Sequence, residues 1–366
     1  MDKLQNNKVL LAMSGGTDSS VAAILLKKRG FDIVGMTFRA YDSIREDCLQ
    51  KETGCCSIDA IYEAKNLAEK LGFEHHIIDV RKQFKETVIK DFIQEYTNGF
   101  TPNPCVICNT EIKWGRMIEE ANRLGCKYLA TGHYAQIGTL NSRYYIKSGV
   151  DTNKDQSYFL WNIPQNNLKR TIFPLGELTK DKVREIAEKN GFSKIATKPE
   201  SQEICFIPNN DYRAFLKDNV PDIMTSIGPG NYIDESGKFL GKHKGFANYT
   251  IGQRKGLDIA LGYPAYVVKI DSKTNTIVLG NRESLRADKA VANSINLMKY
   301  DKIPENIEVY AKIRYNTKAV KSKIQLINNE LHICFLEDVF AVTPGQSVVC
   351  YQENDLICGG IIKKQN

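Results

Sequence analysis

The chain has 366 residues, of which 42% are hydrophobic and 25% are charged, and its formal net charge is +7. At roughly 150 residues per domain this length predicts two or three domains, and the composition excludes a disordered or fibrous protein. The apolar run Val21–Leu26 is much shorter than the roughly 18 residues of a membrane span, and the residues before it resemble neither a secretory signal nor a transit peptide. We therefore expect a cytosolic protein without a membrane segment.

The first 200 residues alternate between strand and helix patterns. Short apolar runs predict strands, and longer segments that end at glycine predict helices. In chain order we expect strand Val9–Met13, helix Ser19–Arg29, strand Ile33–Phe38, helix Ile58–Leu71, strand Glu74–Val80, helix Phe84–Tyr96, helix Glu111–Leu124 and strand Tyr128–Thr131. Strands separated by helices form right-handed βαβ units, so this half is predicted to be an α/β domain with a doubly wound parallel sheet.

The second half differs from the first in composition and in the spacing of its apolar residues. Glycine and proline become frequent after about residue 210, and apolar residues alternate with polar ones. Tyr266–Ile270 and Thr276–Gly280 flank a turn and predict a hairpin. Short strands are expected at Ile307–Arg314, Ser322–Ile327, Leu331–Leu336 and Gln346–Tyr351. These patterns predict three domains, namely a catalytic domain over 1–212, a small linking domain over 213–282 and an all-β, barrel-like domain over 283–366.

The strongest local signal is SGGTDSS, Ser14–Ser20, between the first predicted strand and helix. Two glycines allow a tight turn close to an anion, and a helix N-terminus presents N–H donors to phosphate. Asp18 is placed to hold Mg²⁺ against the phosphates of a nucleotide. The loop contains no lysine, so it is not the G-x-x-x-x-G-K-[ST] loop of ordinary NTPases. A glycine turn with a capped helix is the plainer interpretation of a lone glycine pair, but the complete heptad in the first βα unit favours nucleotide binding.

Several later motifs follow this loop in order: TPNPCVICNTEIKWG (101–115), ATGHYA (130–135), KDQSYFL (154–160), SQEICFI (201–207) and YTIGQRKGL (249–257). Together with SGGTDSS they resemble the tRNA-specific 2-thiouridylase family of the PP-loop ATP pyrophosphatase superfamily. The resemblance runs from residue 8 to about residue 360. It implies adenylation of the C2 oxygen of the wobble uridine of tRNA, followed by replacement of that oxygen with sulfur borne by a cysteine.

The resemblance also implies roles for individual residues. ATP would be bound by Ala12, Met13, Ser14, Gly15, Gly16, Thr17, Asp18, Ser19, Phe38 and Gly132, with Met36 as an alternative to Phe38. Cys108 would be the nucleophile, and Cys205 would carry the persulfide. The target base would meet Asn103, Pro104 and Cys105. Further tRNA contacts would come from His133, Lys154, Asp155, Gln156, Arg314, Tyr315 and Gln346.

Two cysteine-containing segments depart from the common pattern of the family. Cys105 stands where most relatives have an aspartate, and it creates a C-x-x-C pair with Cys108. Together with Cys205 these thiols are candidate ligands of an iron–sulfur cluster, as an alternative to the persulfide route. The segment CLQKETGCC adds Cys48, Cys55 and Cys56, which could relay sulfur, bind a metal or simply pack.

The sequence also indicates the partners. The segment AKIRYNTKAVKSK, 311–323, holds five basic residues and no acid, which suits phosphate contacts of tRNA, although a solvated strand face has the same composition. The basic turn at Arg254 and Lys255 is a further candidate. A protein that donates persulfide sulfur is expected as the second partner. Two other functions remain open, a PP-loop ligase that adenylates a small molecule and a nonenzymatic RNA-binding or iron–sulfur protein.

Overall fold

The computed structural model describes residues 7–41, 58–192 and 204–364. By its internal contacts the chain divides into two compact units. Unit 1 comprises Met1–Val88, Cys105–Asn210 and Asn354–Leu356, and unit 2 comprises Ile89–Pro104, Asp211–Glu353 and Ile357–Asn366. Among the described helices, none combines the length and the apolar character needed to cross a membrane.

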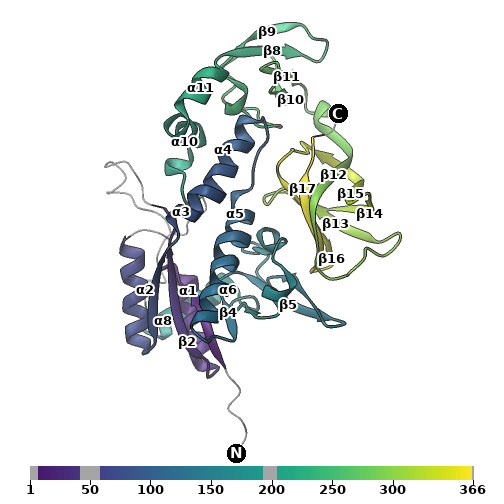
Figure 1. The fold of residues 1–366 in the computed structure, drawn as a ribbon. Coiled ribbons are helices and arrows are strands. Elements are labelled where there is room, and N and C mark those ends of the chain that lie inside the picture. Colours follow the sequence, from purple (N-terminus) through teal and green to yellow (C-terminus); the bar gives the residue numbers. More distant parts are fainter. Residues whose placement is uncertain (1–6, 42–57, 193–203, 365–366) are drawn as a thin grey trace, which may run out of the picture. The chain divides into compact units, whose positions relative to one another are not determined.

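Unit 1 is built on a parallel sheet with the strand order β3-β2-β1-β4-β7. The strands are β1 Lys8–Ala12, β2 Asp32–Arg39, β3 Glu74–Asp79, β4 Tyr128–Ala130 and β7 Thr171–Ile172. The helices are α1 Thr17–Lys28, α2 Ile58–Leu71, α3 Arg81–Phe84, α5 Pro104–Ile107, of which Pro104 is assigned to unit 2, α6 Gly115–Arg123, α7 Gln165–Leu168 and α8 Lys180–Lys189. Figure 1 labels β2 and β4 of this sheet and the helices α1, α2, α6 and α8 of the same unit. The hairpin β5 Ala135–Leu140 and β6 Arg143–Ser148 also belongs to this unit. The predicted α/β class and parallel sheet are confirmed.

The core of unit 1 explains why these segments form helices on a sheet. Val9 and Leu11 of β1 are fully buried among Val21, Ala22 and Leu26 of α1, and apolar residues of α2 and α8 join the same cluster. Central parallel strands are covered on both faces, which is why β1 reads as a continuous apolar run rather than an alternating one. Helix α6 contacts β1 and β4.

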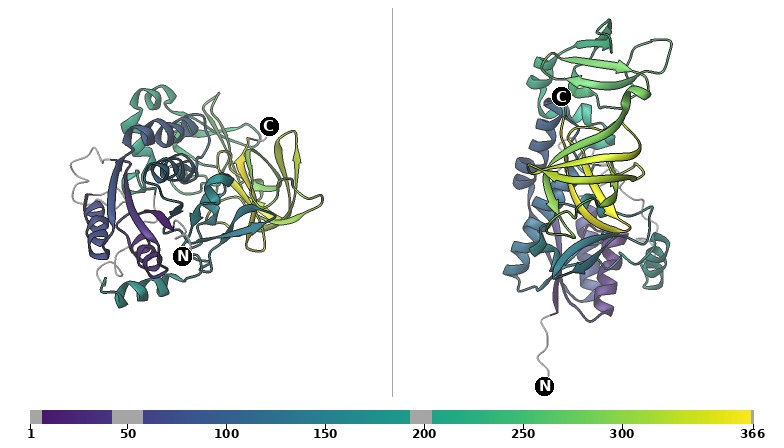
Figure 2. Two further views of the ribbon diagram at one scale, coloured as in Figure 1. Left: turned by 60° about the horizontal axis from the view of Figure 1, so that its bottom comes forward. Right: turned by 90° about the vertical axis from the view of Figure 1, so that its right-hand side faces the viewer.

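Unit 2 contains a small sheet and a barrel, seen from two further directions in Figure 2. The small sheet has the order β10-β11-β8-β9, with β8 Gly230–Asp234, β9 Phe239–His243, β10 Tyr266–Asp271 and β11 Thr276–Gly280. Its helices are α4 Lys90–Thr97, α10 Tyr212–Asn219 and α11 Pro221–Ile227. The predicted hairpin is confirmed, because β10 and β11 pair antiparallel.

The barrel closes because its first and last strands pair with each other. Its order is β12-β15-β14-β13-β16-β17 with an additional β12–β17 pairing, all within the described residues. The bounds are β12 Arg286–Leu297, β13 Glu308–Lys312, β14 Val320–Ile327, β15 Glu330–Phe340, β16 Ser347–Gln352 and β17 Asp355–Ile362. Closure removes exposed strand edges, and alternate residues such as Val309 and Ala311 fill the interior. The predicted all-β barrel-like region is confirmed.

One predicted helix differs in detail. The segment predicted as helix Phe84–Tyr96 consists of α3, a π-helical stretch over Lys85–Ile89 and α4. The helix predicted to start at Glu111 starts at Pro104 instead, and Cys108–Trp114 is π-helical. Proline is well suited to the first turn of a helix, because the N–H that it lacks has no helical partner there. The C-x-x-C pair therefore lies within helical structure.

Candidate active site

The predicted phosphate loop joins β1 to α1. The N–H of Met13 donates to the carbonyl of Met36 at 2.7 Å, which holds the start of the loop against β2. Gly15 has φ of +66°, and a Cβ atom at this position would lie 2.2 Å from the carbonyl oxygen of Ala60. A residue with a side chain cannot occupy this position without moving the backbone of α2. The first glycine of SGGTDSS is thus required by the turn.

Serine hydroxyls order the rest of the loop. The Oγ of Ser19 accepts a hydrogen bond from the N–H of Ser14 at 3.2 Å, and the Oγ of Ser20 donates to the carbonyl of Gly16 at 2.9 Å. Helix α1 begins at Thr17, and its N-cap residue, Gly16, has no side chain that could cap the helix. The N-terminal N–H groups of α1 therefore suit an anion, since they carry the positive end of the helix dipole.

Asp18, in the first turn of α1, accepts hydrogen bonds from two side chains. The ammonium of Lys180 donates to Oδ1 of Asp18 at 2.7 Å, and the hydroxyl of Tyr134 donates to the same oxygen at 2.8 Å. Lys180 begins α8, more than 160 positions along the chain. Sequence reasoning did not single out Lys180, and nothing in its surroundings, GELTKDK, distinguishes it from a lysine in the first turn of a solvated helix.

Gly132 of ATGHYA abuts the same loop. A Cβ atom on Gly132 would lie 2.9 Å from the backbone nitrogen of Ser19 and 3.0 Å from the carbonyl carbon of Asp18. The structure therefore brings Gly132 to the N-terminus of α1, as a residue of the predicted nucleotide pocket. Phe38, in β2, is half-buried, whereas Met36 is fully buried in the sheet. Of these two alternatives, only Phe38 has surface left for a ligand.

His133 sits among aromatic and polar groups. Its ring centroid is 5.6 Å from that of Trp114, Nδ1 lies 2.7 Å from the hydroxyl of Thr131, and Nε2 lies 3.4 Å from the ammonium of Lys113. Burial and the positive charge of Lys113 hold the pKa of His133 well below its usual 6.5. His133 is therefore a neutral hydrogen-bonding group at pH 7, which suits a contact to a base better than one to a phosphate.

The predicted nucleophile begins a π-helical segment. Cys108 and Cys105 are half-buried, and the amide of the adjacent Asn109 donates to the carbonyl of Phe159 at 2.9 Å. This bond connects the helical segment 104–123, which carries both cysteines and is called the cysteine helix below, to the KDQSYFL motif. Single π-helical stretches in helices often mark functional positions, because they change the direction of the side chains that follow.

Asp155 and Gln156 of the KDQSYFL motif form hydrogen bonds with neighbouring segments of the chain. Asp155 accepts hydrogen bonds from the N–H of Gly149 at 3.0 Å and from the hydroxyl of Ser157 at 2.8 Å. Gln156 accepts one from the N–H of Tyr134 at 3.1 Å. Lys154, at the start of the motif, is half-buried. The motif thus supports the ATGHYA segment, which carries Gly132 and His133.

Cys205 is exposed in a segment anchored by its neighbours. Phe206 is 1% exposed, and its ring lies 5.5 Å from the ring of Phe84. The exposed thiol thus projects next to a residue that is fixed in the core. Cys48, Cys55 and Cys56 lie outside the described residues, so their predicted roles are not addressed by the structure.

The predicted iron–sulfur ligand set is not supported. Within the described residues, which include Cys105, Cys108 and Cys205, no group of three or more His, Cys, Asp or Glu side chains is placed to hold a metal ion. A cluster held by the protein needs several thiolates converging on one centre. The three cysteines belong to unit 1 without forming such a group.

Asn103, Pro104, Arg314, Tyr315 and Gln346 belong to unit 2. The amide of Gln346 donates to the carbonyls of Thr101 and Pro102, each at 3.0 Å. The guanidinium of Arg314 donates to the carbonyl of Ile251 at 2.8 Å. It also donates to the carbonyl of Ala341 and to the hydroxyl of Thr343. Both side chains therefore hold loops in place as well as being predicted tRNA contacts.

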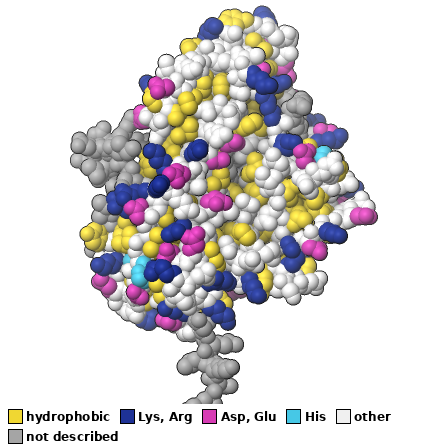
Figure 3. All heavy atoms as spheres, viewed as in Figure 1, with side chains coloured by type: hydrophobic (Ala, Val, Ile, Leu, Met, Phe, Trp, Pro, Cys, Tyr) yellow, Lys and Arg dark blue, Asp and Glu magenta, His cyan; other side chains and the backbone are white. Residues whose placement is uncertain are grey.

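The basic segment 311–323 is partly neutralised. Lys321 pairs with Glu308 at 2.8 Å, and the ammonium of Lys312 lies 5.2 Å from the centroid of the Tyr315 ring. On the face shown in Figure 3, Lys and Arg side chains are interspersed with Asp and Glu. Charge alone therefore does not single out an RNA surface on that face.

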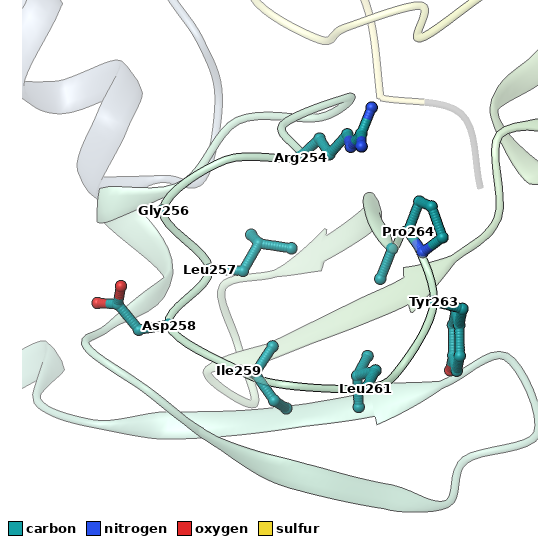
Figure 4. Close-up of a pocket in the computed structure, with 9 residues that line it drawn as sticks. Arg254, Gly256, Leu257, Asp258, Ile259, Leu261, Tyr263 and Pro264 are labelled. Atoms are coloured by element: carbon teal, nitrogen blue, oxygen red, sulfur yellow. The ribbon is translucent and has the colours of Figure 1, made fainter.

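Described residues of unit 2 line two neighbouring hollows that share Arg254. One of about 460 Å³ is lined by residues that include Arg213, Arg254, Lys255 and Arg314. The other, of about 320 Å³, is lined by the loop that runs from Arg254 to Ala265, with Leu257, Ile259 and Leu261 among its side chains (Figure 4). The first hollow is rich in cations and matches the predicted basic turn. The second has mostly apolar side chains and shares Arg254 of the predicted basic turn with the first.

Comparison with known proteins identifies the family of the chain. The family models described as tRNA methyl transferase HUP domain, tRNA methyl transferase PRC-barrel domain and Aminomethyltransferase beta-barrel domain match residues 7–209, 213–281 and 287–362. A tRNA-specific 2-thiouridylase MnmA from Cytophaga hutchinsonii is 46% identical, over 98% of this chain and 98% of its own length. The enzyme of the same name from Natranaerobius thermophilus is 46% identical over 99% of this chain and 98% of its own length. Because such relatives align along almost their entire length, the chain belongs to the tRNA-specific 2-thiouridylase family.

Proposed function

We propose that this protein is an ATP-dependent tRNA-uridine 2-sulfurtransferase that converts the wobble uridine, U34, to 2-thiouridine. The observation that carries the proposal is that one compact unit holds both the phosphate loop with Asp18 and the two cysteine segments of the family. An adenylating ligase needs no such cysteines, and full-length relatives are named tRNA-specific 2-thiouridylases. The ligase alternative is therefore not favoured.

The chemistry follows from the poor leaving ability of the uridine C2 oxygen. That oxygen attacks the α-phosphorus of ATP, the bond to the bridging oxygen breaks, and pyrophosphate leaves. The adenylated oxygen can then depart as AMP when sulfur attacks C2. The N-terminus of α1 and the loop N–H groups bind the phosphates, while Phe38 and Gly132 line the nucleotide pocket.

Asp18 suits Mg²⁺. Within the described chain both donors to its carboxylate use Oδ1, so Oδ2 is available to a cation that is held jointly with the phosphates of ATP. Mg²⁺ commonly binds through one carboxylate together with substrate phosphates. When bound, the ion offsets the negative charge that develops on the departing pyrophosphate.

The sulfur is proposed to travel as a persulfide on Cys205. The exposed thiol can be reached by a persulfide-bearing donor protein, and anchored Phe206 limits its movement. The terminal sulfur attacks C2 and AMP leaves. The Cys108 thiolate then attacks the Cys205 sulfur, which forms a disulfide and releases the thiolated base, and a thiol reductant restores both cysteines.

The proposed tRNA contacts come from several of the sequence motifs. Asn103, Pro104 and Cys105 meet the target base, which must leave the anticodon stack to react. His133, Lys154, Asp155, Gln156, Arg314, Tyr315 and Gln346 are the remaining proposed contacts. We also propose domain boundaries at 1–212, 213–282 and 283–366, and action in the cytosol, where tRNA is found.

The test measures two products of one reaction. Purified protein is incubated with ATP, Mg²⁺, a persulfide donor and unmodified tRNA, and pyrophosphate and 2-thiouridine are quantified. We expect pyrophosphate release that depends on tRNA, with thiolation confined to U34. Pyrophosphate release that is independent of tRNA, without any thiolated base, would contradict the proposal.

A further inference from the structure

Lys180 is a buried cation beside the phosphate loop. Its side chain is 8% exposed, while that of its partner Asp18 is 35% exposed. Lysine is almost never buried to this extent unless a partner compensates the lost hydration. The ion pair with Asp18, at 2.7 Å, provides that compensation.

Its position is set by the start of α8. The N–H of Lys180 donates to Oδ2 of Asp151 at 2.8 Å, and Thr179 caps the helix by accepting from the N–H of Lys182. The ammonium lies 5.9 Å from the centroid of the Tyr134 ring. The Thr179 cap at the start of α8 and the Tyr134 ring therefore help to direct the Lys180 side chain toward the N-terminus of α1.

A negative charge at this place would be unfavourable for ATP if it stood alone. Asp18 lies in the first turn of the helix whose N-terminus receives the phosphates, so its carboxylate repels them. Ordinary NTPase loops carry a lysine that contacts the phosphates, and SGGTDSS has none. Lys180 brings an ammonium to the same end of α1 from a distant part of the chain.

We propose that Lys180 is the phosphate-binding lysine of this site, an inference that rests on the proposed function. When ATP and Mg²⁺ bind, Mg²⁺ shares Asp18, and the Lys180 ammonium donates hydrogen bonds to the phosphates that leave as pyrophosphate. As the bond between the α-phosphorus and the bridging oxygen breaks, its electron pair moves to pyrophosphate, and Lys180 stabilises that charge while keeping its proton.

The test variant is Lys180→Met, which keeps the length of the side chain and removes the charge. We expect kcat for pyrophosphate release to fall roughly 10²-fold, because a charged donor to the leaving group is lost. The affinity for ATP is expected to fall about tenfold while the affinity for adenosine, which lacks phosphates, is unchanged. Lys182→Met, an exposed lysine on the same helix that pairs with Glu185, is the matched control and should behave as wild type.

Two results would overturn the proposal. One is a Lys180→Met enzyme with kcat within about threefold of wild type. The other is an equal loss of ATP and adenosine affinity, which would show that Lys180 only positions the loop. If Lys180→Met does not fold, Lys180→Arg is used instead, because it keeps the charge. We expect Lys180→Arg to preserve the preference for ATP over adenosine. Loss of that preference in folded Lys180→Arg protein would count against the proposal.

The binding measurements also separate this proposal from the proposed function. They need neither tRNA nor a sulfur donor. If the wild-type protein released no pyrophosphate with tRNA, yet its preference for ATP over adenosine vanished in Lys180→Met, the thiolation assignment would fail and the role of Lys180 would stand.

Discussion

At the scale of single residues, the proposed role of Asp18 in the activation of ATP can be tested directly. We predict that Asp18→Ala abolishes pyrophosphate release, because its carboxylate is the proposed Mg²⁺ ligand and the partner of Lys180. The affinity for tRNA, measured by filter binding, is expected to stay within about twofold of wild type, since the proposed tRNA contacts do not include Asp18. Undiminished turnover of ATP in this variant would remove Asp18 from the mechanism.

Cys105 tests the sulfur route. Because Cys105, Cys108 and Cys205 do not form a group that could hold a metal, we predict that Cys105→Ala keeps more than about a third of the thiolation rate with a persulfide donor. Cys108→Ser and Cys205→Ser, the controls, should each abolish thiolation while leaving ATP binding intact. Rates are followed by mass spectrometry of digested tRNA. The iron–sulfur route would be reinstated if folded Cys105→Ala protein were inactive and the wild-type activity required iron.

At the scale of elements, the loop before the cysteine helix is held by the barrel. The N–H of Thr101 donates to the carbonyl of Pro344 at 3.0 Å, and Gln346 holds the two carbonyls of Thr101 and Pro102. A Cβ atom on Gly345 would lie 2.9 Å from the carbonyl oxygen of Thr101, so the two loops touch at backbone level. The segment that leads to Asn103 is therefore ordered by hydrogen bonds from a distant part of the chain.

We predict that Gln346→Ala slows thiolation about tenfold, because two hydrogen bonds of roughly 0.5–1.5 kcal/mol each are lost from the loop that leads to the proposed base contacts. Hydrogen exchange of the amides in 99–103 should accelerate in the same variant. Gln325→Ala, an exposed glutamine on β14, is the matched control for a change without structural consequence. Slower thiolation with unchanged exchange would assign Gln346 to tRNA contact alone.

At the scale of the whole molecule, burial and neighbouring charges shift the pKa of several side chains away from their usual values. Burial, with the charges of His76 and Lys65, lowers the pKa of His75 to about 4, and burial together with Lys242 lowers that of His243 to about 4. Burial and Asp91 raise the pKa of Glu95 to about 6. A lowered histidine pKa means that the unfolded chain binds the proton more tightly, so folding is weakened as pH falls from about 6.5 to 4. A raised glutamate pKa has the opposite effect on folding stability, which it increases as the pH falls.

His243 allows the effect to be isolated. Its side chain is 3% exposed, and Nδ1 accepts a hydrogen bond from the N–H of Gly245 at 3.0 Å. His243→Asn keeps an acceptor but does not titrate. We predict that this variant is less stable than wild type at pH 7, and that the difference narrows by up to about 1.4 kcal/mol per pH unit below pH 6.5. Urea unfolding at pH 7, 6 and 5 measures it, and a difference that is constant with pH would show that His243 does not titrate in this window.

Much of the architecture could be predicted because it depends on local patterns. Continuous apolar runs indicated β1 and β2, and the turn between Ile270 and Thr276 indicated a hairpin. The hairpin β5–β6 was not predicted, although Asn141 and Ser142 both have positive φ, at 47° and 66°, and form a tight connection. Its strands carry too little alternation for periodicity to reveal them. The start of the cysteine helix was placed at Glu111 rather than Pro104, because helix ends carry weak sequence signals.

By itself the sequence determined the phosphate loop, the order of the motifs and the alternation of strands and helices, since each depends on residues that are neighbours in the chain. Only the tertiary structure decided which distant groups complete the site. Lys180 reaches Asp18, Gly132 abuts Ser19, and Gln346 holds the loop before Asn103. Such pairings depend on how helices and loops pack after folding, so the ion pair that offsets the charge of Asp18 leaves no trace in the local pattern around either residue.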